Sequence, residues 1–180
     1  MNIFFVSLDP FDAAELLVDK HVVKMIVESA QLLSTAHRVL DGKESVIMQN
    51  GRRKKVWKLD DARDYEMYQA THINHPSAVW VRESVENYNW LVDHFDGLLK
   101  EYTYRYERVH KCQAMLVTLQ NPPFNLKTWD MTPAPSCVAE DCLIGDLVTN
   151  YRAYYNKHKS HIFSWKKRHP PEWISLELRI

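Results

Sequence analysis

The sequence has few cysteines. Three are present in 180 residues, at positions 112, 137 and 142, and none belongs to a CxxC pair. An odd number without this spacing argues against a disulfide framework and against a zinc site built from thiolates. A chain of this length buries enough surface to fold without such crosslinks. We therefore expect a single domain over residues 1–180, with no metal and no cofactor.

The sequence also lacks an excess of charge of either sign. Lysine and arginine number 23, and aspartate and glutamate also number 23. No overall field then attracts the chain to nucleic acid or to an anionic membrane, so an anion site would have to be local. No run approaches the ~20 apolar residues that cross a bilayer. The apolar start, Met1–Val6, is too short for a signal peptide, and we expect a cytoplasmic protein.

Apolar residues recur at helical spacing in two long stretches. One spans residues 11–40, with a break near Asp19, which is a suitable N-cap for its longer part. The other spans residues 85–106 and begins after Ser84. Shorter helices are expected over residues 61–70, 111–119 and 143–157, and a long packed loop over residues 121–140.

Two segments favour strands. Ile3–Ser7 predicts a short buried strand. Residues 45–59 contain Asn50-Gly51 between two runs of strand formers, which is the usual signal of a two-residue hairpin turn. The sequence therefore predicts a compact helical domain, mainly α (α+β with minor β), with a short N-terminal strand and one β-hairpin.

A polar stripe follows one face of the first long helix. At 100° per residue, this stripe consists of Lys20, Lys24, Glu28, Gln31, Thr35 and Arg38. Such a stripe is often only the solvated face of an amphipathic helix. Lys20 and Lys24, however, are like charges four residues apart, which favours an anion or a carboxylate between them. Lys24 and Glu28 place an amine beside a carboxylate, as acid–base or nucleophilic chemistry requires.

The segment Thr71–Ser77 concentrates hydrogen-bonding side chains at a break before a proline. His72 and His75 have the spacing of two metal ligands, but zinc would need further ligands from elsewhere. They could also cap neighbouring helices, or contact a substrate and transfer protons near neutral pH, together with Asn74. Two side chains that suit a base and its phosphate follow this segment, Trp80 and Arg82.

Basic and aromatic residues gather in three further segments. The strongest run is RRKKVWK at positions 52–58, on the predicted hairpin. It is compatible with nucleic-acid contact, and equally with a solvated edge strand that lysines protect from association. The other two segments span residues 102–111 and 164–169. The sequence does not show whether the three converge.

One resemblance is to an uncharacterised protein family of tailed bacteriophages. It is carried by the string KHVVKM at positions 20–25, which includes His21, by Glu28 and Gln31, and by THINHP at positions 71–76. This resemblance implies a phage-encoded protein in the host cytoplasm, and it implies no particular chemistry.

The chain also resembles the pyrimidine dimer DNA glycosylases, also called endonuclease V enzymes, over about residues 1–110. The order of elements is similar: a polar first helix, a His-Pro element, a long helix, and a basic, aromatic segment such as Glu101–Tyr106, which contains Arg105. The resemblance implies a small helical fold without disulfides. In that family a free N-terminal amine, paired with a glutamate of the first helix, attacks the sugar carbon and forms an imine, after which the strand is cut.

Carried over to this chain, the family's glutamate matches Glu28. The family's amine belongs to a small residue exposed by removal of methionine, whereas this chain has Met1-Asn2, a pair that normally stays intact. Lys20 or Lys24 is then the candidate substitute, since a lysine amine with a lowered pKa forms the same imine.

These residues support two main functions. The first is a DNA N-glycosylase/lyase acting on a modified or damaged base, with Glu28, Lys24 and His75 in catalysis. Substrate contacts would come from Lys20, His21, Gln31, His72, Asn74, Trp80, Arg82 and Arg105. The alternative is a non-catalytic protein that sequesters a nucleotide or another phosphorylated small molecule through the same side chains. A third possibility is a binder of a host protein through its aromatic surface.

Overall fold

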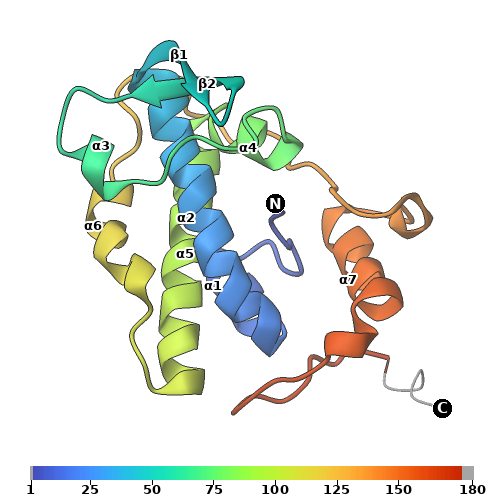
Figure 1. The fold of residues 1–180 in the computed structure, drawn as a ribbon. Coiled ribbons are helices and arrows are strands. Elements are labelled where there is room, and N and C mark those ends of the chain that lie inside the picture. The colour runs from blue at the N-terminus through green and yellow to red at the C-terminus, as the bar shows by residue number, and fades with distance from the viewer. Residues whose placement is uncertain (1, 176–180) are drawn as a thin grey trace.

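Two long helices form the centre of the fold. α2 (Asp19–Asp41) and α5 (Val85–Tyr106) lie side by side in the computed structural model, which describes residues 2–175 (Figure 1). α1 (Pro10–Leu16) packs against α5. The shorter helical elements are α3 (Arg63–Glu66), α4 (Pro76–Val81), η1 (Lys111–Met115), α6 (Leu116–Leu119), η2 (Glu140–Cys142), α7 (Leu147–His158) and η3 (Ser160–Ile162). No described helix is both long enough and apolar enough to cross a membrane.

Local chemistry sets the ends of the long helices. α5 follows Ser84, whose side chain accepts a hydrogen bond from the backbone nitrogen of Asn87. α2 ends at Asp41, directly before Gly42. Both boundaries lie where the sequence predicted them.

The start of α2 differs from the prediction by one residue. Val18 occupies the N-cap position, and no side chain caps this end. Asp19 is already helical, and its carboxylate instead binds Arg105 (3.0 Å) and Ser164 (2.6 Å). A tertiary ion pair has thus taken the side chain that could have capped the helix.

The structure confirms the predicted hairpin. β1 (Lys43–Gln49) and β2 (Arg52–Lys58) pair antiparallel across a two-residue turn. Asn50 and Gly51 have φ values of 51° and 73°, as a tight turn of this twist requires. Figure 1 shows the hairpin at the carboxyl end of α2.

The predicted strand at Ile3–Ser7 is wrong. The segment is buried, but no strand pairs with it among residues 2–175. It runs as an irregular segment between α2 and α7 (Figure 1), with the ring of Phe4 4.3 Å from His21 and that of Phe5 5.3 Å from Trp80. A short apolar run predicts that a segment is buried. A strand additionally needs a neighbouring strand with which it forms backbone hydrogen bonds.

A buried arginine attaches the hairpin to α2. Arg38 is fully buried and donates hydrogen bonds to the carbonyl oxygens of Trp57 (2.8 Å) and Tyr68 (2.6 Å). It also forms an ion pair with Asp64 at 2.6 Å. Arg38 lies on the polar stripe predicted from the sequence, but its partners are parts of the fold.

The remaining predicted elements are present with changed lengths. They are α3 in place of residues 61–70, η1 and α6 in place of 111–119, and α7 in place of 143–157. The long packed loop over 121–140 is confirmed up to the start of η2. One of its contacts is the hydrogen bond from Trp80 Nε1 to the carbonyl oxygen of Thr132 (3.0 Å). The fold is mainly α with one hairpin, as the sequence predicted.

Candidate active site

Glu28 contacts the start of the chain. It lies near the middle of α2, and its side chain is 15% exposed. Its Oε2 accepts a hydrogen bond from the backbone nitrogen of Asn2, at an N–O distance of 3.0 Å. The buried segment after Asn2 lies against α2 and brings this nitrogen to the helix. A carboxylate is therefore held against a nitrogen of the N-terminal segment.

The side chain of Asn2 is fixed on both of its polar atoms. Its Nδ2 donates to the carbonyl oxygen of Cys137 (2.8 Å), and its Oδ1 accepts from the hydroxyl of Tyr151 (2.9 Å). Burial raises the pKa of Tyr151, which keeps this hydroxyl neutral and able to donate. The long loop and α7 thus set the position of Asn2 relative to α2.

Lys24 binds the other oxygen of the same carboxylate. Its Nζ is 3.3 Å from Oε1 of Glu28, in agreement with the four-residue spacing. The Lys24 side chain is 67% exposed, so it lacks the burial that activates many catalytic lysines. Lys20 is exposed and Gln31 is half-buried on the neighbouring turns.

The segment with the two predicted histidines packs on the same side of α2. Thr35 Oγ1 accepts a hydrogen bond from the backbone nitrogen of Thr71 (3.2 Å), about two helical turns after the glutamate. His72 has a φ of 48°, which few non-glycine residues adopt. The carbonyl oxygen of His72 accepts from the backbone nitrogen of His75 (2.8 Å) and closes the turn. The side chains of His72 and Asn74 remain exposed.

His75 is the N-cap of α4. Its Nδ1 accepts a hydrogen bond from the backbone nitrogen of Ser77 (3.2 Å), so the proton of the neutral ring lies on Nε2. Burial lowers the pKa of His75, its neighbour His72 also lowers it, and the charge of Glu28 opposes the shift. The structure thus brings a neutral imidazole into the region of Glu28 and Lys24, the other two side chains predicted for catalysis.

Two predicted substrate contacts belong to the core. His21 is 6% exposed, its Nδ1 is 2.6 Å from the hydroxyl of Tyr155, and burial lowers its pKa to about 3. Trp80 is 2% exposed. Phe4 stacks on His21, and Phe5 packs edge-on with Trp80. Their rings are therefore occupied within the protein and are not available to stack on a base.

Arg105 is also used within the fold. It is 1% exposed and binds Glu101 (2.6 Å), Asp19 (3.0 Å) and two carbonyl oxygens at the end of α1. Four of its five donors are thus already satisfied. Arg82 is half-buried and donates to the carbonyl oxygen of Ala78 (2.9 Å). Arg105 is therefore not presented as an open phosphate contact.

Sequence reasoning missed the groups that hold the N-terminal segment, which are Asn2, Cys137 and Tyr151. The resemblance drew attention to the start of the chain and could have suggested Asn2. No local pattern marks Tyr151, which is 149 residues away from Asn2 in the chain.

Two of the three basic, aromatic segments converge. Arg168 lies over the ring of Tyr104, 4.5 Å from its centroid, and the hydroxyl of Tyr104 donates to the carbonyl oxygen of Lys167 (3.2 Å). The hairpin lies at the opposite end of α2 and α5 (Figure 1). Its aromatic residue, Trp57, is 7% exposed and so does not offer a free ring face.

One cluster among residues 2–175 has the side-chain types of a metal site. Ligand atoms of Asp141, Cys142 and His158 lie within 4.8 Å of one another. Nζ of Lys157 is 3.6 Å from the carboxylate of Asp141, and burial raises the pKa of the Cys142 thiol. Both features oppose a bound cation, so we assign no metal to this cluster.

Comparison with known proteins gives one family. The family model described as pyrimidine dimer DNA glycosylase matches residues 1–114, which include α2, the hairpin and α5. No curated protein and no solved structure matches the chain.

Proposed function

Because the chain belongs to the pyrimidine dimer DNA glycosylase family, we propose that it is a DNA N-glycosylase and lyase acting on damaged pyrimidines in duplex DNA. The observation that carries this proposal is the 3.0 Å contact between the backbone nitrogen of Asn2 and Oε2 of Glu28. It holds a carboxylate of α2 beside the start of the chain, which is where the family's α-amine is expected.

The nucleophile in this proposal is the α-amino group of the mature chain. The reacting nitrogen would be that of Asn2 once the residue before it is removed, because this nitrogen is the one held 3.0 Å from Glu28. An ordinary α-amine has a pKa of about 8 and an ordinary lysine one of about 10.4, so far more of the α-amine is free base at neutral pH. The side chain of Lys24 is 67% exposed and is paired with the carboxylate of Glu28 at 3.3 Å. We therefore place the α-amine ahead of Lys24, which the sequence alone had favoured.

The chemistry proceeds in two stages. The amine nitrogen attacks C1′ of the sugar, the C1′–N bond to the base breaks, and the base leaves with the bonding electrons and takes up a proton. The amine loses its protons as the sugar ring opens, the ring oxygen gains one, and a C1′=N imine forms. Transfer of a C2′ proton to a carboxylate or to water then forms a C2′=C3′ double bond, and the C3′–O bond breaks with its electrons leaving on the phosphate, which cuts the strand.

Three side chains assist these steps. The carboxylate of Glu28 accepts a proton from the attacking amine and stabilises the positive charge that develops on the sugar. The Nε2–H of His75 donates a hydrogen bond to the departing base or to a flanking phosphate. Lys24 contributes its charge next to Glu28 and binds a phosphate.

Borohydride trapping tests this proposal. Wild-type protein incubated with ultraviolet-irradiated or abasic duplex DNA and borohydride should give a covalent adduct on the N-terminal peptide, located by mass spectrometry. Glu28→Gln keeps an acceptor for the Asn2 nitrogen but cannot transfer the proton, so adduct formation should slow by about 10²- to 10⁴-fold. Lys24→Ala should retain the adduct.

Other outcomes would contradict the proposal in different ways. An adduct on Lys24 would show the lyase chemistry with the wrong nucleophile. No adduct and no strand cleavage on any damaged duplex would refute the proposed activity. Stabilisation by nucleotides in a thermal-shift screen, without cleavage, would then favour the sequestering protein.

A further inference from the structure

The β1–β2 hairpin projects from the fold with its side chains in solvent. All seven residues of β1 are exposed, and the first four of β2 are exposed as well. Only its base is buried, through Trp57. The hairpin therefore packs on the body at one end and leaves both faces of the other end uncovered.

The charge of the hairpin contrasts with the neutrality of the chain. Between positions 43 and 58 there are six basic residues and one acidic residue. Lys55 pairs with that acid, Glu44, at 2.7 Å. Within residues 2–175, Arg52 and Arg53 have no ion pair and no side-chain hydrogen bond. The hairpin thus carries a net positive charge, and Arg52 and Arg53 have no acidic partner within the described residues.

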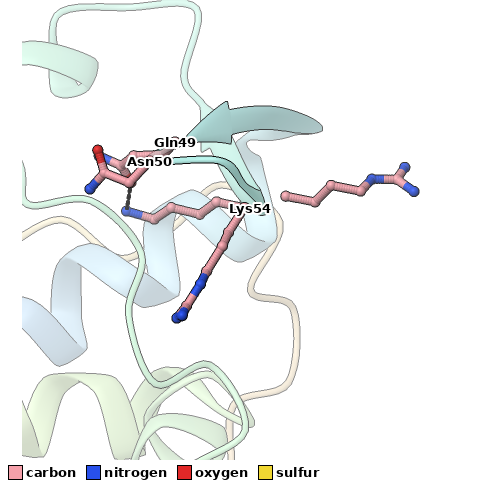
Figure 2. Close-up of a pocket in the computed structure, with 5 residues that line it drawn as sticks. Gln49, Asn50 and Lys54 are labelled. Atoms are coloured by element: carbon pink, nitrogen blue, oxygen red, sulfur yellow. Dashed lines mark hydrogen bonds between the residues drawn. The ribbon is translucent and has the colours of Figure 1, made fainter.

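Some of these basic side chains line an open pocket of about 510 Å³ at the turn of the hairpin. Lys54 reaches back to the side chain of Gln49 (2.9 Å) next to Asn50, as Figure 2 shows. The amide is neutral, so the lysine keeps its full charge. The pocket is lined by Gln49, Asn50, Arg52, Arg53 and Lys54. Cations and amide donors around an open pocket suit a phosphate group.

Apolar side chains accompany the cations. Three consecutive residues of β1 are exposed, Val46 (47%), Ile47 (43%) and Met48 (68%). Each is opposite a basic residue of β2 in the ladder. Lysines alone could serve to protect an edge strand, but three exposed apolar neighbours on the same edge would promote association. A partner that offers both phosphates and apolar surface accounts for both features.

We propose that the hairpin Lys43–Lys58 is a second contact with duplex DNA, in which its cations bind backbone phosphates along a groove and its apolar side chains lie against the sugars. This inference rests on the proposed function for the choice of DNA as the partner. A two-stranded β-ribbon fits the width of a DNA groove, and apolar side chains commonly enter grooves beside basic ones.

The position of the hairpin sets the distance between this DNA contact and the candidate active site. Glu28 and the end of α2 at Asp41 are separated by about 20 Å along the helix axis, at 1.5 Å per residue. That length corresponds to about six base pairs at 3.4 Å each. With α2 lying along the duplex axis, the hairpin would contact DNA about half a helical turn away from the damaged base.

Binding to an undamaged duplex tests this proposal without depending on catalysis. Fluorescence anisotropy over a range of salt concentrations would compare wild type with Arg52→Ala/Arg53→Ala/Lys54→Ala. Since each phosphate contact contributes about 0.9 to the salt slope, the variant should lower the slope by about 2 to 3 and the affinity by at least about tenfold. Lys100→Ala/Lys111→Ala/Lys127→Ala removes the same charge from other surfaces and should bind within about threefold of wild type.

A second variant tests whether the exposed apolar side chains of β1 contribute to DNA binding. Ile47→Ser/Met48→Ser keeps the charge, so it should weaken binding without changing the salt slope. Circular dichroism of each variant would establish that it is folded.

The outcomes separate this inference from the proposed function. Equal binding by the hairpin variant and its charge-matched control would overturn the inference, and so would a wild-type protein that fails to bind duplex DNA. Hairpin-dependent binding without any strand cleavage would refute the proposed activity and leave the inference intact. Cleavage by the hairpin variant at saturating DNA, at the wild-type rate, would support a contact distinct from the active site.

Discussion

Two basic regions at opposite ends of α2 and α5 use similar residues for different purposes. One is the hairpin, and the other is the carboxyl-terminal basic cluster, which consists of Arg105, Lys166, Lys167 and Arg168. In this cluster Glu101 binds both Arg105 (2.6 Å) and Arg168 (2.9 Å), and Lys167 pairs with Glu107 at 2.5 Å. On the hairpin, one of six cations has a carboxylate partner in the described chain, at Lys55.

The comparison shows that basic and aromatic residues in a sequence do not by themselves indicate a nucleic-acid surface. The role of a basic side chain depends on the groups that it binds within the protein. A guanidinium that is buried and bound by carboxylates and carbonyl oxygens stabilises the fold, since removing it would leave buried charges unpaired. An exposed one without a carboxylate can bind a phosphate. The cluster should therefore govern stability and the hairpin should govern DNA binding.

The largest effect is expected at Arg105. Arg105→Met leaves the carbonyl oxygens of Glu15 and Leu17 without this donor and leaves Glu101 with Arg168 alone, and should lower the free energy of unfolding by about 3–5 kcal/mol. Denaturant titration measures this loss. Arg105→Lys keeps the charge but loses the fork geometry of the guanidinium. Its free energy of unfolding should lie between those of wild type and Arg105→Met. If Arg105→Met left the stability unchanged but impaired DNA binding, the carboxyl-terminal cluster would be a DNA-binding surface and not a support of the fold.

Acid should destabilise both ends of α2 through buried histidines. At the hairpin end, burial and then the nearby Arg63 lower the pKa of His37 to about 4, while Asp41 and Asp61 oppose the shift. At the other end burial lowers the pKa of His21 to about 3. The unfolded chain then takes up protons first, near pH 6.5. Full stability is present above this pH and is lost as pH falls toward the folded pKa, by about 3–5 kcal/mol per histidine.

Substitution of one histidine sharpens this expectation. His37→Gln removes the titrating group at the hairpin end and keeps an amide that can bond with neighbouring groups. Unfolding midpoints measured between about pH 7 and pH 4 should fall less steeply in the variant than in wild type. Parallel curves would show that His37 does not contribute.

A smaller effect is expected from the hairpin turn. Gly51 has a φ of 73°, and Gly51→Ala should cost about 1 kcal/mol locally because the added Cβ disfavours this conformation. The turn should loosen without any change in charge, so affinity for duplex DNA should fall while its salt slope is retained. Asn50→Gly, at a φ of 51°, should preserve the turn and serve as the control. Amide hydrogen exchange of β1 and β2 would measure the loosening.

The smallest effect on stability is expected from the hairpin cations. Arg52→Ala/Arg53→Ala should change the melting temperature by less than about 2 °C, because both side chains are exposed and have no partner to lose within the described residues. The same variant should weaken DNA binding. A large loss of stability would mean that the hairpin cations support the fold, as those of the carboxyl-terminal cluster do.

Much of the local structure follows from the sequence by itself. The Asn50-Gly51 turn, the start of α5 after Ser84 and the pairing of Lys24 with Glu28 were all predicted correctly. Each depends on groups within about four residues of one another. Interactions over such short separations are fixed once the local backbone conformation is known.

The tertiary structure alone decided where the candidate site is and which cations are open. Asn2 meets Glu28 and Tyr151 only because the N-terminal segment lies between α2 and α7. Arg38 and Arg105 look like surface cations in the sequence, yet both are buried. An apolar run or a basic residue specifies what kind of environment it needs, but the partner that supplies it comes from a distant part of the chain, and packing selects that partner.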